Sequence, residues 1–329
     1  MLPKSPLIVQ DLNNLHLDIH TIGYPNEGET LLTLLCDGNE VLFSVLTDCY
    51  EDNGYNHATQ ILKEFNVNQI DAFIWTHPDK DHSLGIPDFL DKYDPQKKAE
   101  IFLPHLNRKM GLKQKALGAL NYVKKHYNKN RKYDAIFVEL HKGDVKPEMR
   151  LIIEVMNPRV TIKCSHNFLL PNDNVVDRIL DSDTKPLLND LSIVYFIKFN
   201  GISFFFCGDL SERNVQFIDP VFFKNSVFIK IPHHGSDNES DDLNKRLVPL
   251  FRSQDVKHAI STTTVFKCQN LPKDEVLKEY CTISDGVYCT SNINEQSSEP
   301  YGCITVKFYA NMQKPEVITS GNAYCYYHV

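Results

Sequence analysis

The sequence lacks several features that would place it in a familiar class at once. Its nine cysteines include no C-x-x-C pair, and no apolar run approaches the ~20 residues of a membrane span. Its first residues lack the apolar core of a signal peptide, and its formal charge is −7, with no excess of basic residues. These absences argue against a membrane-spanning protein, a secreted protein and one that coats nucleic acid non-specifically, although a local basic surface is still compatible with them.

The composition is that of a folded protein. The cysteines are odd in number, and several lie within apolar, strand-like runs, which favours packed, reduced thiols and a soluble, cytoplasmic protein. With 329 residues, of which 42% are hydrophobic, the chain can bury a large core. We therefore expect one large domain or two smaller ones.

Residues 76–82 combine two imidazoles and two carboxylates directly after an apolar run, residues 70–75, that predicts a buried strand. A loop at the end of a strand can turn such side chains inward around a pair of cations, because alternate residues of an extended segment share a side. The alternative is a polar turn whose side chains only cap the next helix. The four potential ligands are His77, Asp79, Asp81 and His82.

Other predicted strands also end in polar side chains. Residues 15–46 predict a β-meander, whose first strand alternates histidines and an aspartate with apolar residues and whose last strand ends at Asp48. Asn200-Gly201 predicts a type I′ hairpin whose second strand ends at Asp209, and His233 and His234 follow a further short strand. These residues are candidates for the same site, with a capping role as the alternative for Asp48.

The middle of the chain is harder to interpret. Residues from about 105 to 132 are strongly basic with scattered apolar positions, which predicts an amphipathic helix. Its Lys124 and Lys125 are candidates for guiding phosphates, or belong simply to a solvated helix face. Residues 134–140 and 151–155 are predicted to form a strand pair, and residues from about 159 to 186 a polar loop insertion.

Three segments, in this order and spacing, resemble the metallo-β-lactamase superfamily: Thr-His-Pro-Asp-x-Asp-His at 76–82, Gly-Asp at 208–209 and Pro-His-His-Gly-Ser at 232–236. More narrowly, they resemble the soluble hydrolase domain of the ComEC-type competence protein, which imports DNA. The resemblance covers most of the chain. It implies an α/β fold of the αββα sandwich type, formed as a single domain over residues 1–329, with a dinuclear metal site along one edge of the sheets.

The resemblance also implies individual roles. The matching metal ligands are His77 and Asp79 for one ion, Asp81 and His82 for the other, and Asp209 as the bridging carboxylate. Asp79 stands where most of the superfamily has a second His, and the added carboxylate makes the site harder, so the two divalent ions are expected to be zinc or manganese. Asp48 matches a residue that supports the ligands from behind.

Two positions of the expected ligand set are open. The third ligand of the first metal should lie near residues 189–190, where Asp190 is favoured because an ionised oxygen is the better donor. The family often has a His just before the proline at 272, and this chain has Leu271 there. The second metal therefore borrows His233 or His234, or it is held loosely.

The expected chemistry follows from the metals. A cation pair can activate water and stabilise both oxygens of a displacement at phosphorus, which suits a phosphodiester. Asp81, His234 and Lys230 are the candidate catalytic groups, where Lys230 has a solvent-facing charge as its alternative. Ser236 either donates to a phosphate oxygen or caps the following helix.

Three function classes are compatible with these features. The first is a phosphodiesterase or nuclease acting on nucleic acid or another phosphodiester. The second is a hydrolase of another ester, lactone or amide, because one fold hosts many reactions. The third is a degenerate, non-catalytic interaction module with a protein partner in a multi-protein system such as a defence system, which the missing histidine and the expected insertion would favour.

Overall fold

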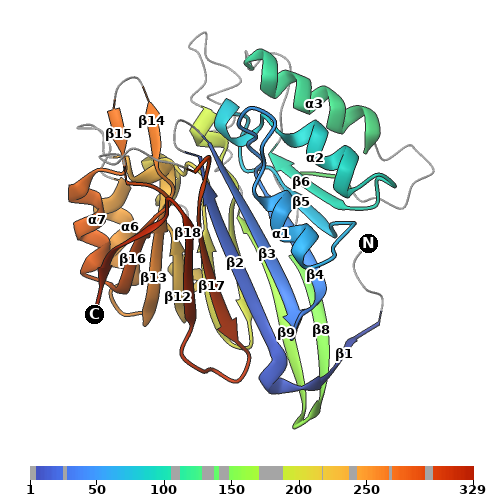
Figure 1. Ribbon diagram of the computed structural model, residues 1–329. Coiled ribbons are helices and arrows are strands. Elements are labelled where there is room, and N and C mark those ends of the chain that lie inside the picture. Colours follow the sequence, from blue (N-terminus) through green and yellow to red (C-terminus); the bar gives the residue numbers. More distant parts are fainter. Residues whose placement is uncertain are drawn as a thin grey trace.

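The structure is a computed structural model in which two mixed β-sheets lie face to face and helices cover their outer faces (Figure 1). The prediction of a mixed α/β fold with a pair of sheets is thus confirmed. No helix of the part described combines the length and apolarity needed to cross a membrane. The structure describes residues 5–24, 28–104, 112–127, 137–140, 148–169, 188–216, 218–236, 243–266, 269–292 and 299–329.

The first sheet is antiparallel on one side and parallel on the other, where β4, β5, β6 and β7 run in the same direction. Its outer face carries α1 (Ala58–Glu64), α2 (Ile86–Tyr93) and α3 (Gln114–His126). Its eight strands lie in the order β18 (Glu316–Gly321), β17 (Gly302–Tyr309), β2 (Leu15–Gly23), β3 (Glu29–Asp37), β4 (Glu40–Thr47), β5 (Ala72–Ile74), β6 (Glu100–Pro104) and β7 (Phe137–Leu140).

The second sheet carries α5 (Glu212–Val215), α6 (Leu243–Phe251) and α7 (Asp274–Cys281) on its outer face. Its β10–β11 turn has Asn200 and Gly201 at positive φ, which confirms the predicted type I′ hairpin. Its nine strands lie in the order β1 (Leu7–Asp11), β8 (Glu148–Asn157), β9 (Arg159–Leu169), β10 (Val194–Phe199), β11 (Ile202–Phe206), β12 (Ser226–Lys230), β13 (Val256–Ser261), β16 (Ser284–Cys289) and β19 (Tyr324–His328).

Short elements connect these layers. A separate hairpin projects from the end of β13, and it consists of β14 (Thr264–Phe266) and β15 (Gln269–Leu271). The 3-10 helices are η1 (Leu12–Asn14), η2 (Lys80–His82), η4 (Leu188–Leu191), η5 (Pro220–Phe223) and η6 (Pro232–Gly235).

The period-two pattern of the strands explains the layering. In β2, Leu15, Leu17 and Ile19 face the core between the sheets, so the residues between them face the helix side. The inter-sheet core is completed by alternate residues of β8, β10 and β11, and each sheet packs a second apolar face against its helices. Both sheets therefore bury two faces where helices cover them, whereas alternate residues of β8 and β9 are exposed on the outer face of the second sheet.

Two predictions about the middle of the chain are wrong. Residues 134–140 and 151–155 do not pair, because β7 lies at the edge of the first sheet and β8 lies in the second. Residues 159–169 are not part of a loop insertion but form β9, which pairs with β8 and β10. Because one face of β9 is polar and exposed, its alternation of apolar and polar residues is weak in the sequence. The remainder of the expected insertion, residues 170–187, lies outside the described residues.

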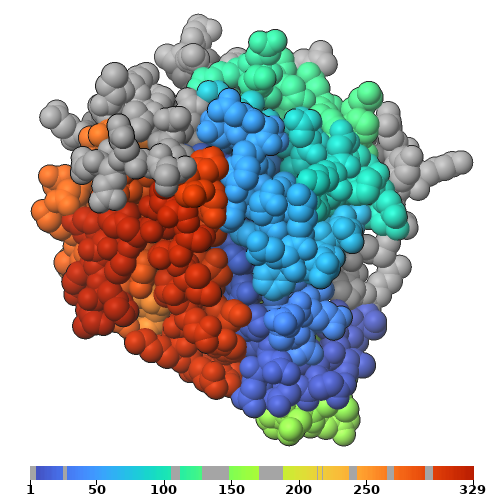
Figure 2. Space-filling view, in the orientation of Figure 1, coloured from blue at the N-terminus to red at the C-terminus, as the bar shows by residue number. Residues whose placement is uncertain are grey.

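The carboxyl ends of the parallel strands meet at one edge of the sandwich. This is the upper edge in Figure 1, from which β14 and β15 project, whereas the β17–β18 connection lies at the opposite edge. Figure 2 shows residues from the N-terminal part of the sequence (blue) against residues from the C-terminal part (red and orange) on one face, which agrees with the pairing of β17 with β2. Side chains from both halves of the chain can therefore meet at the upper edge, where open α/β sheets commonly bind ligands.

Candidate metal centre

Asp209, which follows β11, lies between two groups of imidazoles. Its Oδ1 is 3.4 Å from Nε2 of His82 and 3.7 Å from Nε2 of His234. Its Oδ2 is 3.7 Å from Nε2 of His77 and 3.9 Å from Nε2 of His233. The two oxygens of one carboxylate thus face two separate sets of nitrogen donors.

Each set gains a second carboxylate from the loop after β5. Oδ2 of Asp81 lies 3.3 Å from His234 Nε2 and 3.6 Å from His82 Nε2. Oδ2 of Asp79 lies 3.8 Å from His77 Nε2. Two donors held at ~2.1 Å from a tetrahedral ion are about 3.4 Å apart, so these separations suit one cation in each set.

Buried donor atoms without partners indicate where such ions fit. Within the described part of the chain, Nε2 of His77, Nε2 of His82 and Oδ1 of Asp209 are buried and have no hydrogen-bond partner. Buried polar atoms are nearly always hydrogen-bonded, and the Asp209 carboxylate lies within 3.7 Å of both nitrogens. The residues present therefore fit divalent cations, which the imidazoles and carboxylates around Asp209 could hold.

Asp48 holds two of the imidazoles from behind. Its carboxylate accepts hydrogen bonds from Nδ1 of His82 at 2.7 Å and from the backbone N–H and hydroxyl of Thr76 at 2.7 and 2.6 Å. Because the Thr76 hydroxyl donates to Asp48, it accepts from Nδ1 of His77 at 3.1 Å. Both rings therefore carry their proton on Nδ1 and present a free Nε2 to the centre, as metal ligands do.

Glu29, at the start of β3, does the same for His234. Nδ1 of His234 lies 2.8 Å from the hydroxyl of Thr262, which in turn donates to the Glu29 carboxylate. Burial would raise the pKa of Glu29, but the Lys230 ammonium and the nearby imidazoles lower it to about 2. No sequence pattern singles out Glu29, because a single glutamate at a strand start carries no motif.

The structure does not support the catalytic role predicted for Lys230. Its side chain has no exposed surface, and its ammonium lies 2.8 Å from Glu29 Oε2 and donates to the carbonyl of Ile231 at 3.1 Å. A buried, paired ammonium cannot reach a substrate at the open side of the centre. Lys230 instead neutralises the carboxylate behind His234.

Tight backbone turns bring adjacent residues to the same place. Asp48, Gly208, His233 and His234 all have φ between +48° and +53°. The left-handed conformation costs about 1–2 kcal/mol for a residue with a side chain, and consecutive left-handed residues turn neighbouring side chains to one side. This turn lets His233 and His234 face the two different oxygens of Asp209.

Two further predicted residues, the candidate ligand Asp190 and the candidate substrate-binding or capping residue Ser236, lie near the centre with other contacts. Asp190 is buried in η4, but no described group of converging ligand atoms includes its carboxylate. The neighbouring Asn189 instead donates from its amide to Nε2 of His233 at 3.2 Å. Ser236 is buried at the end of η6, where its carbonyl accepts from the Asn244 side chain at 3.2 Å, and the predicted role of its hydroxyl stays a prediction.

The segment before Pro272 contributes no imidazole, as its sequence requires. It forms β15, and the following Lys273 N–H donates to the carbonyl of Gly235 at 3.0 Å, which fixes the segment beside η6. Of the alternatives left open by the sequence, the geometry matches the one in which His234 joins the second ion's ligands.

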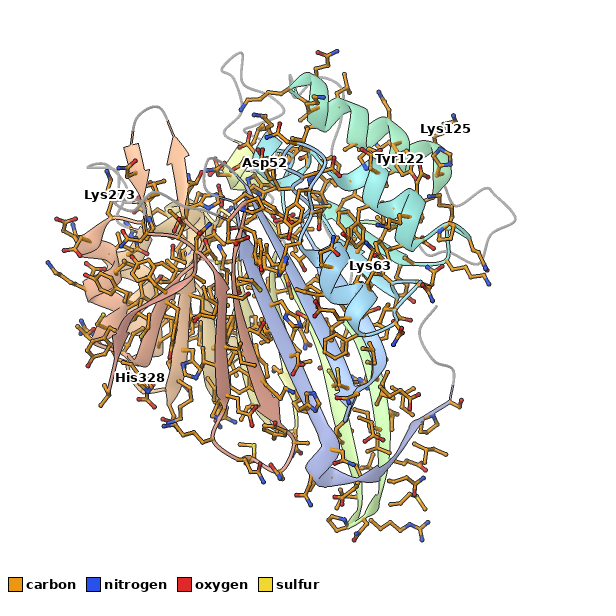
Figure 3. The ribbon with its side chains drawn as sticks, viewed as in Figure 1. Asp52, Lys63, Tyr122, Lys125, Lys273 and His328 are labelled. Atoms are coloured by element: carbon orange, nitrogen blue, oxygen red, sulfur yellow. The ribbon has the colours of Figure 1, made fainter. Side chains whose placement is uncertain are left out.

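The basic helix meets the centre through its first turn. Lys113, which caps α3, lies 3.4 Å from Oδ1 of Asp79. Lys124 and Lys125 lie in the last turn, roughly 16–18 Å further along the helix axis. Figure 3 shows Lys125 at the far end of α3. The predicted phosphate-guiding pair is therefore remote from the centre, and Lys113, which was not singled out, is adjacent to it. Residues 105–111 and 128–132 of the predicted basic segment lie outside the described residues.

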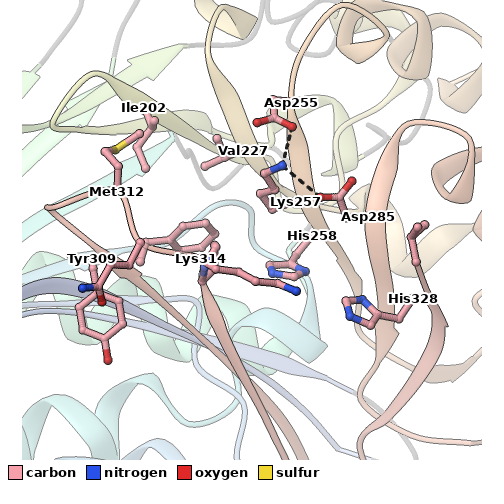
Figure 4. Close-up of a pocket in the computed structure, with 14 residues that line it drawn as sticks. Ile202, Val227, Asp255, Lys257, His258, Asp285, Tyr309, Met312, Lys314 and His328 are labelled. Atoms are coloured by element: carbon pink, nitrogen blue, oxygen red, sulfur yellow. Dashed lines mark hydrogen bonds and ion pairs between the residues drawn. The ribbon is translucent and has the colours of Figure 1, made fainter.

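A separate cavity of about 440 Å³ lies at the opposite edge (Figure 4). It is lined by the first residues of β12, β13 and β16 and by the β17–β18 connection. Figure 3 shows His328, which lines it, well below Lys273, whose backbone adjoins the metal centre. The cavity is thus distinct from the candidate centre.

A scan against protein-family models and a search of curated proteins both find no match for this chain. The resemblance to the metallo-β-lactamase superfamily therefore rests on the motifs, and any functional conclusion rests on the geometry of the centre.

The buried ion pair makes a testable prediction. Lys230→Met should lower the free energy of unfolding by about 3–5 kcal/mol, because it leaves the Glu29 carboxylate buried without its cation. The double variant Glu29→Gln, Lys230→Met should recover much of this loss. Urea denaturation of the wild type, Lys230→Met and the double variant measures the effect. A Lys230→Met protein with unchanged stability but a greatly reduced kcat would instead support the catalytic role of Lys230.

The charges of the centre predict how the metal-free protein responds to pH. Burial disfavours charged forms, but the carboxylate of Asp209 and its neighbours outweigh it and raise the pKa of His82 and of His234. Stability from these protonated rings is complete below their unfolded pKa of about 6.5 and is lost as pH rises through the raised folded values.

The melting temperature of the chelator-treated protein should therefore fall as pH rises above about 6.5. Metal-loaded protein should show a smaller fall, because ions replace the protons. In Asp209→Asn the carboxylate that raises both pKa values is absent, so the fall should shrink. An identical slope in wild type and Asp209→Asn would contradict the assignment.

Proposed function

We propose that the protein is a metal-dependent hydrolase of the metallo-β-lactamase fold, with a dinuclear centre that acts on phosphodiesters. The observation that carries the proposal is the position of Asp209, whose two oxygens face two sets of donors: His82 and His234 on one side, and His77 and His233 on the other. A carboxylate shared in this way is how two ions are held at a short separation.

The surrounding architecture supports the fold part of the proposal. The two sheets, their helical covers and the position of the centre at the carboxyl ends of parallel strands agree with the αββα sandwich that the motifs imply. The five motif residues His77, Asp79, Asp81, His82 and Asp209 also converge, although 127 residues separate His82 from Asp209.

Two divalent ions would lower the pKa of water and stabilise negative charge on the oxygens of a phosphate ester. The chain itself orients the ligands through Asp48 and Glu29 and leaves one side open. Asp81 and His233 each have about a quarter of their side-chain surface exposed, so the centre faces solvent there. Lys113, whose side chain is 60% exposed, places a positive charge at this side, where it would attract a phosphate.

The alternatives gain less support. A hydrolase of carboxylic esters, lactones or amides would use the same ions, but it would have no need of the cation at Lys113. A non-catalytic module that had lost its metals would be expected to have gaps in the donor sets. Here one set retains two imidazoles and two carboxylates, and the other retains His77 with oxygens of Asp79 and Asp209, beside His233, whose Nε2 accepts from Asn189. Metal content and substrate preference decide among the three.

The decisive experiment loads the purified protein with manganese or zinc and assays a chromogenic phosphodiester beside a carboxylic ester, a lactone and an amide. The phosphodiester should be cleaved fastest, and Asp209→Asn should lose both ions and activity while keeping the size of a side chain. Preference for another substrate would select the second alternative. A wild type with less than one ion per chain after loading would select the non-catalytic module.

The lysines of α3 separate a small phosphodiester from a polymer. Lys113→Ala should raise KM for a chromogenic phosphodiester and for single-stranded DNA, because its charge adjoins the centre, with little change in kcat. The double variant Lys124→Ala, Lys125→Ala should raise KM for DNA only, and it should reduce the salt dependence of DNA binding, if a nucleic-acid backbone follows the helix. A Lys113→Ala protein with unchanged KM on both substrates would remove the phosphate-binding role.

A further inference from the structure

A second cluster of ligand atoms lies on the helix-facing side of the first sheet, far from Asp209. It consists of His16 and Asp18 on β2 and Cys36 on β3, and we call it the β2–β3 cluster. The strand register creates it: His16 and Asp18 are two apart and share a face, and His16 lies directly opposite Cys36. All three are buried, with exposed fractions of 3%, 2% and 0%.

The atoms of this cluster face one another in a way that calls for a positive charge. Nε2 of His16 lies 3.4 Å from Oδ1 of Asp18, and neither atom has a hydrogen-bond partner within the described residues. Nδ1 of His16 lies 2.8 Å from the carbonyl of Asn14, which can only accept, so Nδ1 carries the ring proton. In the neutral ring, Nε2 then presents a lone pair to a carboxylate oxygen, which is unfavourable in a buried place unless a cation or a second proton lies between them.

The sulfur of Cys36 favours a metal ion over a proton. One ligand atom from each of the three residues lies within 4.8 Å of the other two, and the separation of the nitrogen and oxygen is that of two ligands of a tetrahedral ion. The ammonium of Lys307 lies 3.9 Å from Oδ2 of Asp18 and leaves Oδ1 to the cluster. Imidazole, carboxylate and thiolate together are a donor set that zinc accepts.

We propose that His16, Asp18 and Cys36 supply three ligands of one zinc ion at a site separate from the dinuclear centre. Binding converts the Cys36 thiol to a thiolate, and its proton passes to solvent. Cys36 is seven residues along β3 from Glu29, or about 23 Å from the edge that holds Asp209. An ion there joins β2 to β3 and takes no part in hydrolysis, so the proposal does not depend on the proposed activity.

Cobalt distinguishes this site from the dinuclear centre, because a cobalt–thiolate bond gives an intense near-ultraviolet absorption and the donor atoms of the centre are nitrogen and oxygen. Protein produced in medium containing Co²⁺ should show this band and retain it in Asp209→Asn. Cys36→Ser should lose the band and one cobalt ion per chain. Cys303 is a buried cysteine of the adjoining β17, and Cys303→Ser should keep both the absorption band and the cobalt ion.

Absorption spectra and metal analysis of the four proteins, repeated after refolding with Co²⁺, complete the test. A band that survives in Cys36→Ser, or a wild type whose centre is loaded but which shows no band, would overturn the site. Asp18→Asn is a second variant of the cluster that keeps the side-chain shape, so a general loss of folding is not expected. It should lower cobalt content as Cys36→Ser does. Unchanged cobalt content in Asp18→Asn would also contradict the proposal.

Discussion

Two buried carboxylates, Asp48 and Glu29, constrain the arrangement of the candidate centre. Asp48 accepts from His82 directly and reaches His77 through a threonine hydroxyl, and Glu29 reaches His234 through another. Each carboxylate thereby sets the tautomer of the ring in front of it, so that Nε2 faces the candidate centre. Because β3 and β4 are antiparallel neighbours, the first residue of one and the residue after the other lie at the same edge. The register of the β3–β4 hairpin therefore places both carboxylates where they can orient the imidazoles of the candidate centre.

The cost of burying Glu29 explains Lys230. A lone carboxylate in this position would be strongly destabilised, and a full ammonium at 2.8 Å offsets much of its desolvation. A hydrophobic pair would be expected to give at least the same stability, but it could not hold the Thr262 hydroxyl or orient His234. The ion pair between Glu29 and Lys230 therefore positions His234 and adds little net stability to the fold.

The two candidate metal sites differ in ways that match different roles. The candidate centre around Asp209 lies at strand ends, offers nitrogen and oxygen donors and includes partly exposed side chains, so it is open to solvent. The β2–β3 cluster lies within a sheet face, includes a sulfur donor and is closed to solvent. Loops at strand ends can vary their geometry and open a coordination position, whereas residues in paired strands are held by the ladder and suit a closed, structural site.

The sequence by itself determined the alternating strands, the Asn200-Gly201 hairpin and the cluster at residues 76–82, because these depend on local periodicity, turn chemistry and short spacing. It could not show that β7 and β8 belong to different sheets, since pairing over long distances leaves no local pattern. Only the tertiary structure decided that Glu29 supports a ligand, that Lys230 is buried and that Lys113 adjoins the centre. These roles depend on which strand ends meet, and that is set by packing between segments far apart in the chain.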